Sequence, residues 1–474
     1  MSGIVYETGL IKRLGEAITV EEVNEYAQTW STTLGRSLSV MMPEKEGVVP
    51  PVADDLVALI GSIMAADMDA PDQDEALAPL MATKPTAGTI VSREEVAEIG
   101  ATKVTLSNGI VVWLKPTDFK EDEVLISAAS PGGYHSVSEE DLVAARTATA
   151  IRNRSGVGEH DVTSLGKVLA GKKISLSTSI SSSSESLYGS ASPDDLEDAF
   201  ALAHLMMTAP RFDETAFANE MQSRASSLEN RLSTPDAQLS DAFTTMIWGE
   251  NVRRKPWTVD DLSQMDLKKS AAFYADRFAD SDDFTWWITG AFTMDVIEPL
   301  LATYVASLPV VEGAETQADD GVRRQDGTAN VEVRAGSEPK ASVMISFHKE
   351  ASYDAQSRLA LKAAKHLLST RLREVLREDL SGVYGVGVRA SIGRFPVELA
   401  TGMINFGCNP ERVDELMTAT FDVITALRTD DVDPQYLENF KEQERRSWET
   451  DHKRNSYWQG VMTRAFWSGE PLSE

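Results

Sequence analysis

The residues best suited to chemistry lie in the stretch Arg371–Val388, whose sequence is RLREVLREDLSGVYGVGV. The pattern predicts the end of a helix, a turn at Gly382 and the start of a strand. Arg377 and Tyr384 stand seven residues apart across that turn, so we expect their side chains to converge beside it. A guanidinium and a phenol hydroxyl are both good donors to a carbonyl or an oxyanion. The plainer alternative, in which Arg377 pairs with a carboxylate and Tyr384 packs in the sheet, stays open.

The six histidines do not match a known metal or catalytic motif. None stands in H-E-x-x-H or H-x-x-E-H, the helical spacings that place two imidazoles on one zinc ion. His204 and His366 lie in apolar helical stretches, where a structural role is the default. His135 has Glu139 nearby, which leaves a metallopeptidase with scattered ligands as one alternative. Without a G-x-S-x-G elbow or a phosphate loop, the residues alone do not indicate a self-sufficient enzyme.

Composition places the chain among ordinary globular proteins of two or three domains. It has 474 residues, of which 42% are hydrophobic and 25% are charged. Its formal net charge of −29 argues against nucleic acid or an anionic membrane as a partner. Cys408 is the only cysteine, which excludes an intrachain disulfide and a cysteine-based zinc site. No apolar stretch is long enough to span a bilayer, and the first residues do not resemble a signal peptide.

The N-terminal part predicts few elements. Thr19 and Glu22 form a capping-box pattern at the start of a short helix. Ser37–Pro43 is expected to be a strand and Val52–Asp67 a helix. We therefore interpret residues 1–45 as the tail of a preceding repeat unit and residues 46–98 as a linker containing one helix.

A complete α/β unit is expected over residues 99–310. Asn108-Gly109, between two runs of alternating apolar residues, predicts a hairpin over Thr102–Pro116. Further strands are expected at Glu123–Gly133, Ile174–Ser192 (a serine-rich pair) and Asp283–Phe292, and helices at Ser138–Arg152, Pro193–Thr208, Asp213–Asn230, Gln264–Arg277 and Met294–Leu308.

The same order of elements begins again after a polar linker at residues 311–328. SPDDLEDAF (Ser192–Phe200) matches NPERVDELM (Asn409–Met417) in pattern, 217 positions on. MIWGE (Met246–Glu250) recurs as FWSGE (Phe466–Glu470) at a similar offset. A near-constant offset over several elements indicates a duplicated fold. We interpret residues 329–474 as a second unit, truncated at its C-terminus, that carries the Arg377/Tyr384 pair. The alternative is a permuted protein whose N-terminal tail completes its last unit.

Three stretches resemble the pitrilysin/insulinase family of zinc metallopeptidases, specifically their C-terminal half. They are Val104–Gly133, Phe273–Phe292 and Leu376–Val388, and the resemblance covers nearly the whole chain. It implies an α+β fold of tandem metallopeptidase-type units, each with an antiparallel-rich sheet and helices packed on one face. In that family the N-terminal half carries the inverted zinc motif, and the C-terminal half has lost it. The family's arginine and tyrosine that reach the scissile carbonyl match Arg377 and Tyr384.

The resemblance implies a substrate-binding half of a zinc metalloendopeptidase that cleaves peptides in an enclosed chamber. Arg377 and Tyr384 would bind the scissile carbonyl, and Gly385 and Gly387 would let a peptide backbone come close, although glycines also relieve crowding. We expect no metal ligand in this chain, with zinc in an N-terminal half that is the partner. A periplasmic location follows only by family analogy. The alternative function is an inactive interaction or scaffold subunit built on the same fold.

Overall fold

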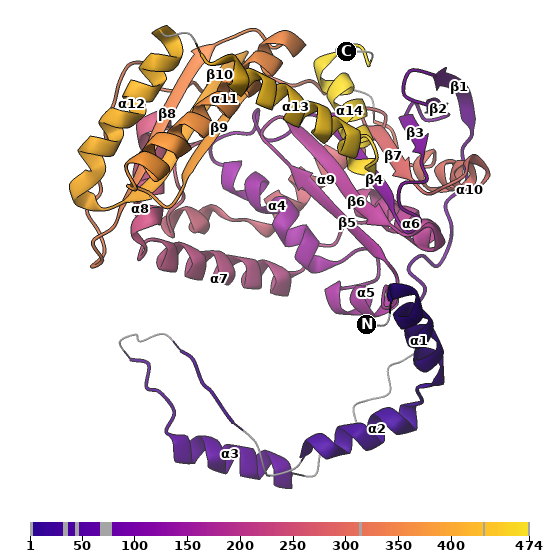
Figure 1. Ribbon diagram of the computed structural model, residues 1–474. Helices are drawn as coiled ribbons and strands as arrows, with labels where there is room; N and C mark the ends of the chain where they lie inside the picture. Colours follow the sequence, from indigo (N-terminus) through magenta and orange to yellow (C-terminus); the bar gives the residue numbers. More distant parts are fainter. Residues whose placement is uncertain are drawn as a thin grey trace. The chain divides into compact units, whose positions relative to one another are not determined.

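The computed structural model describes residues 3–31, 37–42, 47–66, 78–311, 315–429 and 432–472. The chain divides into two units, Met1–Asp74 and Glu75–Glu474 (Figure 1).

The part of the N-terminal unit that the structure describes contains three helices, α1 (Ile4–Ala17), α2 (Val20–Gln28) and α3 (Ala53–Ala65), with a 3₁₀ turn at Thr29–Ser31. The predicted capping box is confirmed: the Glu22 amide donates to the Thr19 hydroxyl at 3.2 Å, and the Thr19 amide donates to the Glu22 carboxylate at 3.1 Å. The strand predicted at 37–43 is wrong over the described residues 37–42, which have no strand pairing. A strand needs a neighbour to satisfy its backbone groups, and the alternating pattern alone does not supply one.

The larger unit is built on a seven-stranded sheet with the order β1-β2-β3-β7-β4-β6-β5. Its strands are β1 (Ile90–Val96), β2 (Ala101–Leu106), β3 (Val111–Pro116), β4 (Val124–Pro131), β5 (Ile174–Ile180), β6 (Ser184–Ala191) and β7 (Thr285–Gly290). Every pair is antiparallel except β3 and β7, which run parallel. The predicted hairpin is confirmed, since β2 and β3 pair with Thr105 opposite Val111 across the Asn108-Gly109 turn.

Helices of the first repeat cover one face of this sheet. Their bounds are α4 (Leu142–Ser155), α5 (Val162–Val168), α6 (Leu196–Thr208, after a 3₁₀ turn at Pro193–Asp195), α7 (Glu214–Arg231), α8 (Pro235–Trp248), α9 (Leu267–Ala279, after a 3₁₀ turn at Asp260–Gln264) and α10 (Met294–Leu300), which continues as a π-helical segment to Val305. The main core joins Phe200 of α6 and Tyr274 of α9 to Ile126 and Trp286 of the sheet, and all four are fully buried. Of these helices, α5 and α8 were not predicted.

The first sheet begins before residue 99, where the complete α/β unit was expected to start. β1 lies inside the stretch 46–98 that was expected to be a linker, and it pairs with β2 along its length, from Ile90 opposite Leu106 to Val96 opposite Ala101. Five of its seven residues are exposed, as expected for an edge strand, so its own sequence carries no alternating apolar signal.

The second repeat has a three-stranded sheet with the order β8-β10-β9 (Figure 1). Its elements are β8 (Ala341–Glu350), α11 (Ala355–Leu372), a π-helical segment at Arg373–Asp379, β9 (Val386–Gly393), β10 (Leu399–Cys408), a 3₁₀ turn at Pro410–Arg412, α12 (Val413–Thr429), α13 (Pro434–Asp451) and α14 (Asn455–Ser468). Its core joins Leu376 of the π-helical segment, Phe406 of β10 and Leu416 of α12. Within the described residues, three helices follow β10.

The two repeats correspond element by element. The order β8-β10-β9 repeats the order β4-β6-β5 of the first sheet. α7 and α13 each have 18 residues and begin 220 positions apart, and α8 and α14 each have 14 residues and the same offset. Gly249 and Gly469 cap the last pair with positive φ angles of 63° and 68°. The predicted α+β fold of tandem units, each with an antiparallel-rich sheet, is therefore confirmed.

The second repeat also supplies the cover for the other face of the first sheet. Met462 of α14 is fully buried in a cluster with Ala129 of β4 and Trp287 of β7. The rings of Trp287 and Phe466 meet edge to face with centroids 5.3 Å apart. Because Trp286 and Trp287 point to opposite faces, β7 is buried on both sides, and the two repeats share one structural body.

Candidate functional site

The predicted site residues lie at the end of the π-helical segment (Arg377), on the connection after it (Tyr384 and Gly385) and at the start of β9 (Gly387). α11 continues directly into that segment, so one helical rod runs from Ala355 to Asp379. The Leu380 amide donates to the Val375 carbonyl at 3.0 Å, and the Gly382 amide donates to the Leu376 carbonyl at 2.9 Å. These bonds end the helix and turn the chain toward β9, as the sequence predicts.

Residues from α12 and the turn before it hold this connection in place. The Arg412 guanidinium donates to the Leu380 and Ser381 carbonyls at 3.1 and 3.4 Å, and it is itself fixed by Glu415 at 2.8 Å. Leu416 packs so closely that a Cβ on Gly382 would lie 2.4 Å from its Cδ2 atom. A side chain at position 382 would therefore require the Leu416 side chain or the turn to shift.

Val383 and Tyr384 leave the turn in opposite directions. Val383 is 8% exposed and belongs to the core beneath the second sheet, whereas Tyr384 is 100% exposed. The structure therefore contradicts the alternative in which Tyr384 packs in the sheet. Its hydroxyl is presented to the surroundings by a backbone that is anchored on both sides.

Arg377 is also exposed and has no hydrogen bond or ion pair with any residue that the structure describes. Other arginines of the same rod are paired: Arg371 lies 2.7 Å from Glu374, and Arg373 lies 3.9 Å from Glu378. The alternative in which Arg377 pairs with a nearby carboxylate is thus not what the structure shows. Arg377 and Tyr384 share one surface segment with both donors available to an outside partner.

The two glycines after Tyr384 differ in their surroundings. A Cβ on Gly385 would meet no atom within 4 Å, so this position faces open space. Gly387 pairs with Asn405 of β10, and a Cβ there would lie 2.6 Å from the Asn405 side-chain oxygen. Gly387 therefore relieves crowding between strands, while Gly385 leaves the backbone beside Tyr384 uncovered.

The histidines have structural contacts. Nδ1 of His204 lies 2.8 Å from the Tyr304 carbonyl, and burial lowers the pKa of its ring. Nδ1 of His135 lies 2.7 Å from the Gly132 carbonyl. Within the described ranges, one group of three residues could hold a metal ion, the carboxylates Asp280, Asp282 and Asp283, and it contains no histidine. These three residues do not match the donor set of a catalytic zinc site.

A pair of neighbouring carboxyl groups, of which Glu185 is buried and Glu315 half-buried, was not predicted. Glu185 of β6 is fully buried and accepts a hydrogen bond from the Gly133 amide at 2.8 Å. Burial, together with the nearby Glu315, raises the pKa of Glu185 to about 8. Arg277 of α9 lies 2.5 Å from Glu315. Nothing in the serine-rich stretch around Glu185 signals this pairing, because Glu315 is distant in the sequence.

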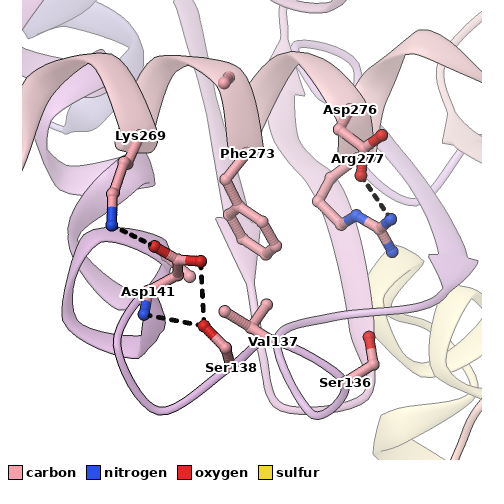
Figure 2. Close-up of a pocket in the computed structure, with 10 residues that line it drawn as sticks. Ser136, Val137, Ser138, Asp141, Lys269, Phe273, Asp276 and Arg277 are labelled. Carbon is pink, nitrogen blue, oxygen red and sulfur yellow. Dashed lines mark hydrogen bonds and ion pairs between the residues drawn. The ribbon is translucent and has the colours of Figure 1, made fainter.

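A pocket lies between α9 and the loop before α4 (Figure 2). It has a volume of about 510 Å³. Figure 2 shows Lys269 and Asp141 joined across it, with 2.6 Å between their charged groups, and Asp141 in turn accepts from Ser138 at 2.9 Å. The charged groups that line the pocket therefore bind one another. None of the predicted site residues lines it.

Comparison with known proteins agrees with this architecture. Residues 264–444, which include Arg377 and Tyr384, match the family described as the peptidase M16 inactive domain. The chain is 23% identical to a PQQL-like zinc protease of Arabidopsis thaliana over 98% of its own length and 48% of the relative. It is 25% identical to the probable zinc protease PqqL of Escherichia coli over 76% of its length and 38% of the relative.

Residues 264–444 are thus similar to the inactive domain of the M16 peptidases. The crystal structure of the periplasmic protease PqqL from Escherichia coli superposes on all of this chain with a TM-score of 0.75, at 22% identity, and the match covers 52% of that protein. The chain thus spans about half the length of the relatives it matches. The predicted resemblance to the C-terminal half of this family is confirmed. No helix among the described residues has the length and apolarity needed to cross a bilayer.

Proposed function

We propose that this chain is the substrate-binding half of an M16-type zinc metalloendopeptidase. In this proposal Arg377 and Tyr384 donate to the scissile carbonyl of a peptide. The observation that carries it is the exposed, unpaired state of both donors on a connection that is otherwise firmly anchored. Preorganised donors stabilise charge that develops in a transition state because no reorganisation is needed when the reaction occurs.

The comparisons support a proposal in which zinc and the carbonyl-binding residues lie in different halves of the enzyme. The relatives are zinc proteases about twice the length of this chain, so the zinc is proposed to lie in a second half that this chain would partner. Zinc in such a site polarises the carbonyl and activates a water molecule. The groups of this chain would bind the same carbonyl oxygen and hold the peptide backbone, and Gly385 leaves the space for that backbone. In this proposal Gly387 does not contact the peptide. Its role is to keep β9 and β10 in register.

An enclosed chamber and a periplasmic location extend the same proposal. The Escherichia coli relative is described as periplasmic. A chamber would form when the two halves close on each other, which would exclude water from the carbonyl and strengthen the two hydrogen bonds. The alternative is a subunit that only binds and assembles, and the peptidase M16 inactive domain is compatible with it.

A binding experiment on the chain separates these two functions. A fluorescently labelled, unstructured peptide is titrated with the chain, with Arg377→Met, with Tyr384→Phe, and with Arg373→Met as a control from the same helical rod. We expect both site variants to weaken binding several-fold and the control to leave it unchanged. Equal affinity for all four proteins would favour the scaffold function.

A further inference from the structure

Arginine side chains gather around two tryptophan rings where the first repeat meets the linker to the second. At the Trp257 ring, the guanidinium carbons of Arg146 and Arg224 lie 4.5 and 5.6 Å from the ring centroid. At the Trp248 ring, those of Arg254 and Arg324 lie 5.6 and 5.0 Å away. The arginine cluster consists of Arg146 of α4, Arg224 of α7, Arg253 and Arg254 of the loop after α8, and Arg324 of the linker.

The carboxylates that pair with this cluster are less exposed than its cations. Arg254 pairs with Asp320 at 3.0 Å, and 23% of the arginine side chain is exposed against 5% of the aspartate. Arg224 pairs with Glu220 at 2.6 Å, with 31% of the arginine exposed against 7% of the glutamate. An approaching ligand therefore meets the guanidinium groups, while the carboxylates lie beneath them.

The other three arginines form no ion pair with a carboxylate in the part of the chain that the structure describes. Arg253 donates to main-chain carbonyls, among them that of Tyr134 at 3.3 Å. Arg324 is half-buried and donates to the Ser346 hydroxyl at 3.4 Å, which is a neutral acceptor. Arg146 is also half-buried, and because its Nη1 atom is enclosed, it contributes mainly its charge. The cluster thus carries more positive than negative charge.

This excess of positive charge stands out in a chain with a formal net charge of −29. Burial, together with the like charges of Arg254 and Arg224, lowers the pKa of Arg146, although Tyr134 and Asp261 oppose the shift. A carboxylate brought to the cluster from outside would offset this repulsion. Local positive potential on an acidic protein also attracts the negatively charged part of a ligand.

We propose that the arginine cluster binds an acidic segment of the peptide substrate, which rests on the proposed function of the chain as a substrate-binding half. The cations surround two separate rings, so the ligand is an extended segment with several carboxylates and not a single small anion. Guanidinium groups bind carboxylate oxygens in pairs, and the indoles offer apolar surface to the peptide between them. A nucleic acid fits less well, because its longer run of phosphates would meet the acidic remainder of the chain.

The test titrates labelled peptides with the unmutated chain and measures fluorescence anisotropy at pH 7 and about 0.15 M salt. The peptides have capped ends and Gly-Ser spacers between Glu-Asp, Gln-Asn or Lys-Lys pairs. We expect the acidic peptide to bind about tenfold more tightly than the neutral one, and the difference to shrink several-fold at about 0.5 M salt. Equal affinity for the acidic and neutral peptides would overturn the proposal. An oligonucleotide of equal charge that binds as tightly as the acidic peptide would overturn the assignment to peptides.

Variants at the two rings assign the binding to the cluster. Arg224→Gln and Arg324→Gln should each weaken binding of the acidic peptide by about 2–5-fold and leave the neutral peptide unaffected. Glu220 keeps a partner when Arg224 is replaced, because Arg154 lies 2.7 Å from it. Unchanged affinity in both variants would overturn the assignment. If a variant does not fold, the comparison of acidic and neutral peptides on the unmutated chain still decides.

Arg323→Gln is the matched control for Arg324→Gln. It removes the same charge one position away on the linker, from a side chain that is 44% exposed and bound to Asp319 at 2.8 Å. Its affinity for the acidic peptide should stay within about 1.5-fold of the unmutated chain, because salt screens charges that do not contact the ligand. A loss as large as that of Arg324→Gln would show a diffuse charge effect and contradict a site at the cluster.

The same titrations distinguish this proposal from the proposed function. If Arg377→Met and Tyr384→Phe leave the affinity for the neutral peptide unchanged while the acidic preference persists, the role of Arg377 and Tyr384 fails and binding at the arginine cluster stands. If both variants weaken binding of the neutral peptide but the unmutated chain has no acidic preference, the proposed function stands and the arginine cluster does not bind the peptide.

Discussion

Val383 and Tyr384 are neighbours in the chain, yet Val383 is 8% exposed and Tyr384 is 100% exposed. The buried valine ties the connection to the core of the second repeat, and the tyrosine is presented outward by the same backbone. This pairing of an anchor with an exposed donor is what a binding element requires, because a fixed donor loses little entropy when a partner arrives.

The turn that carries Tyr384 depends on the absence of a side chain at Gly382. We expect Gly382→Ala to destabilise the chain by about 1–3 kcal/mol, because the new Cβ would clash with Leu416. Gly385→Ala is the control, since no atom lies within 4 Å of a Cβ there, and it should change stability by less than about 0.5 kcal/mol. Urea unfolding midpoints measure both. Equal effects of the two substitutions would contradict the packing of Leu416 on the turn.

The contact between the repeats should be a major source of stability. Met462 of α14 is fully buried against Trp287 and Ala129 of the first sheet. Met462→Ala should lower the free energy of unfolding by about 2–5 kcal/mol, because it leaves a cavity at this contact. The exposed Met64, outside this unit, provides a control: Met64→Ala should have almost no effect. A loss below about 0.5 kcal/mol for Met462→Ala would show that α14 does not bind the first sheet as described.

Stability should fall as the pH rises through the neutral range. The pKa of Glu185 is raised to about 8 by burial and by Glu315, against an ordinary value of 4.5, while the Gly133 amide and Arg277 oppose the shift. Between these two values the folded chain holds a proton that the unfolded chain has released, so stability decreases from about pH 4.5 to about pH 8.

Glu185→Gln should remove that part of the pH dependence, because the amide cannot ionise. Glu121→Gln, at an exposed position, should retain it. Chemical unfolding at pH 5, 6.5 and 8 provides the comparison. A stability that increases over this range in the unmutated chain, and is unaffected by Glu185→Gln, would show that Glu185 is ionised in the folded state.

Local signals in the sequence were sufficient for most elements. The Asn108-Gly109 turn and the capping box at Thr19 were predictable because each depends on residues within a few positions of one another. β1 was missed because it is an edge strand with exposed residues, and its pairing with β2 decides its conformation. The strand predicted at 37–43 was wrong for the opposite reason. Its apolar residues alternate, but over the described residues 37–42 no partner strand pairs with them.

The candidate site was predictable in residue type but not in environment. Arg377 and Tyr384 stand out by spacing and chemistry, whereas their lack of partners depends on where Glu374, Glu378 and the second sheet lie. Arg152 in the last turn of α4 is only 3% exposed, and its sequence context, which resembles an exposed helix end, did not signal this burial.

The central claim is best tested by the kcat/KM of the complete two-half enzyme for a quenched fluorescent peptide. Arg377→Met and Tyr384→Phe should each lower kcat/KM by about 10²–10³-fold, mainly through kcat, because they remove donors that act in the transition state. Arg373→Met, on the same helical rod, should leave it within about twofold of the unmutated enzyme. Unchanged kcat/KM in both site variants would contradict the assignment of Arg377 and Tyr384 to the scissile carbonyl.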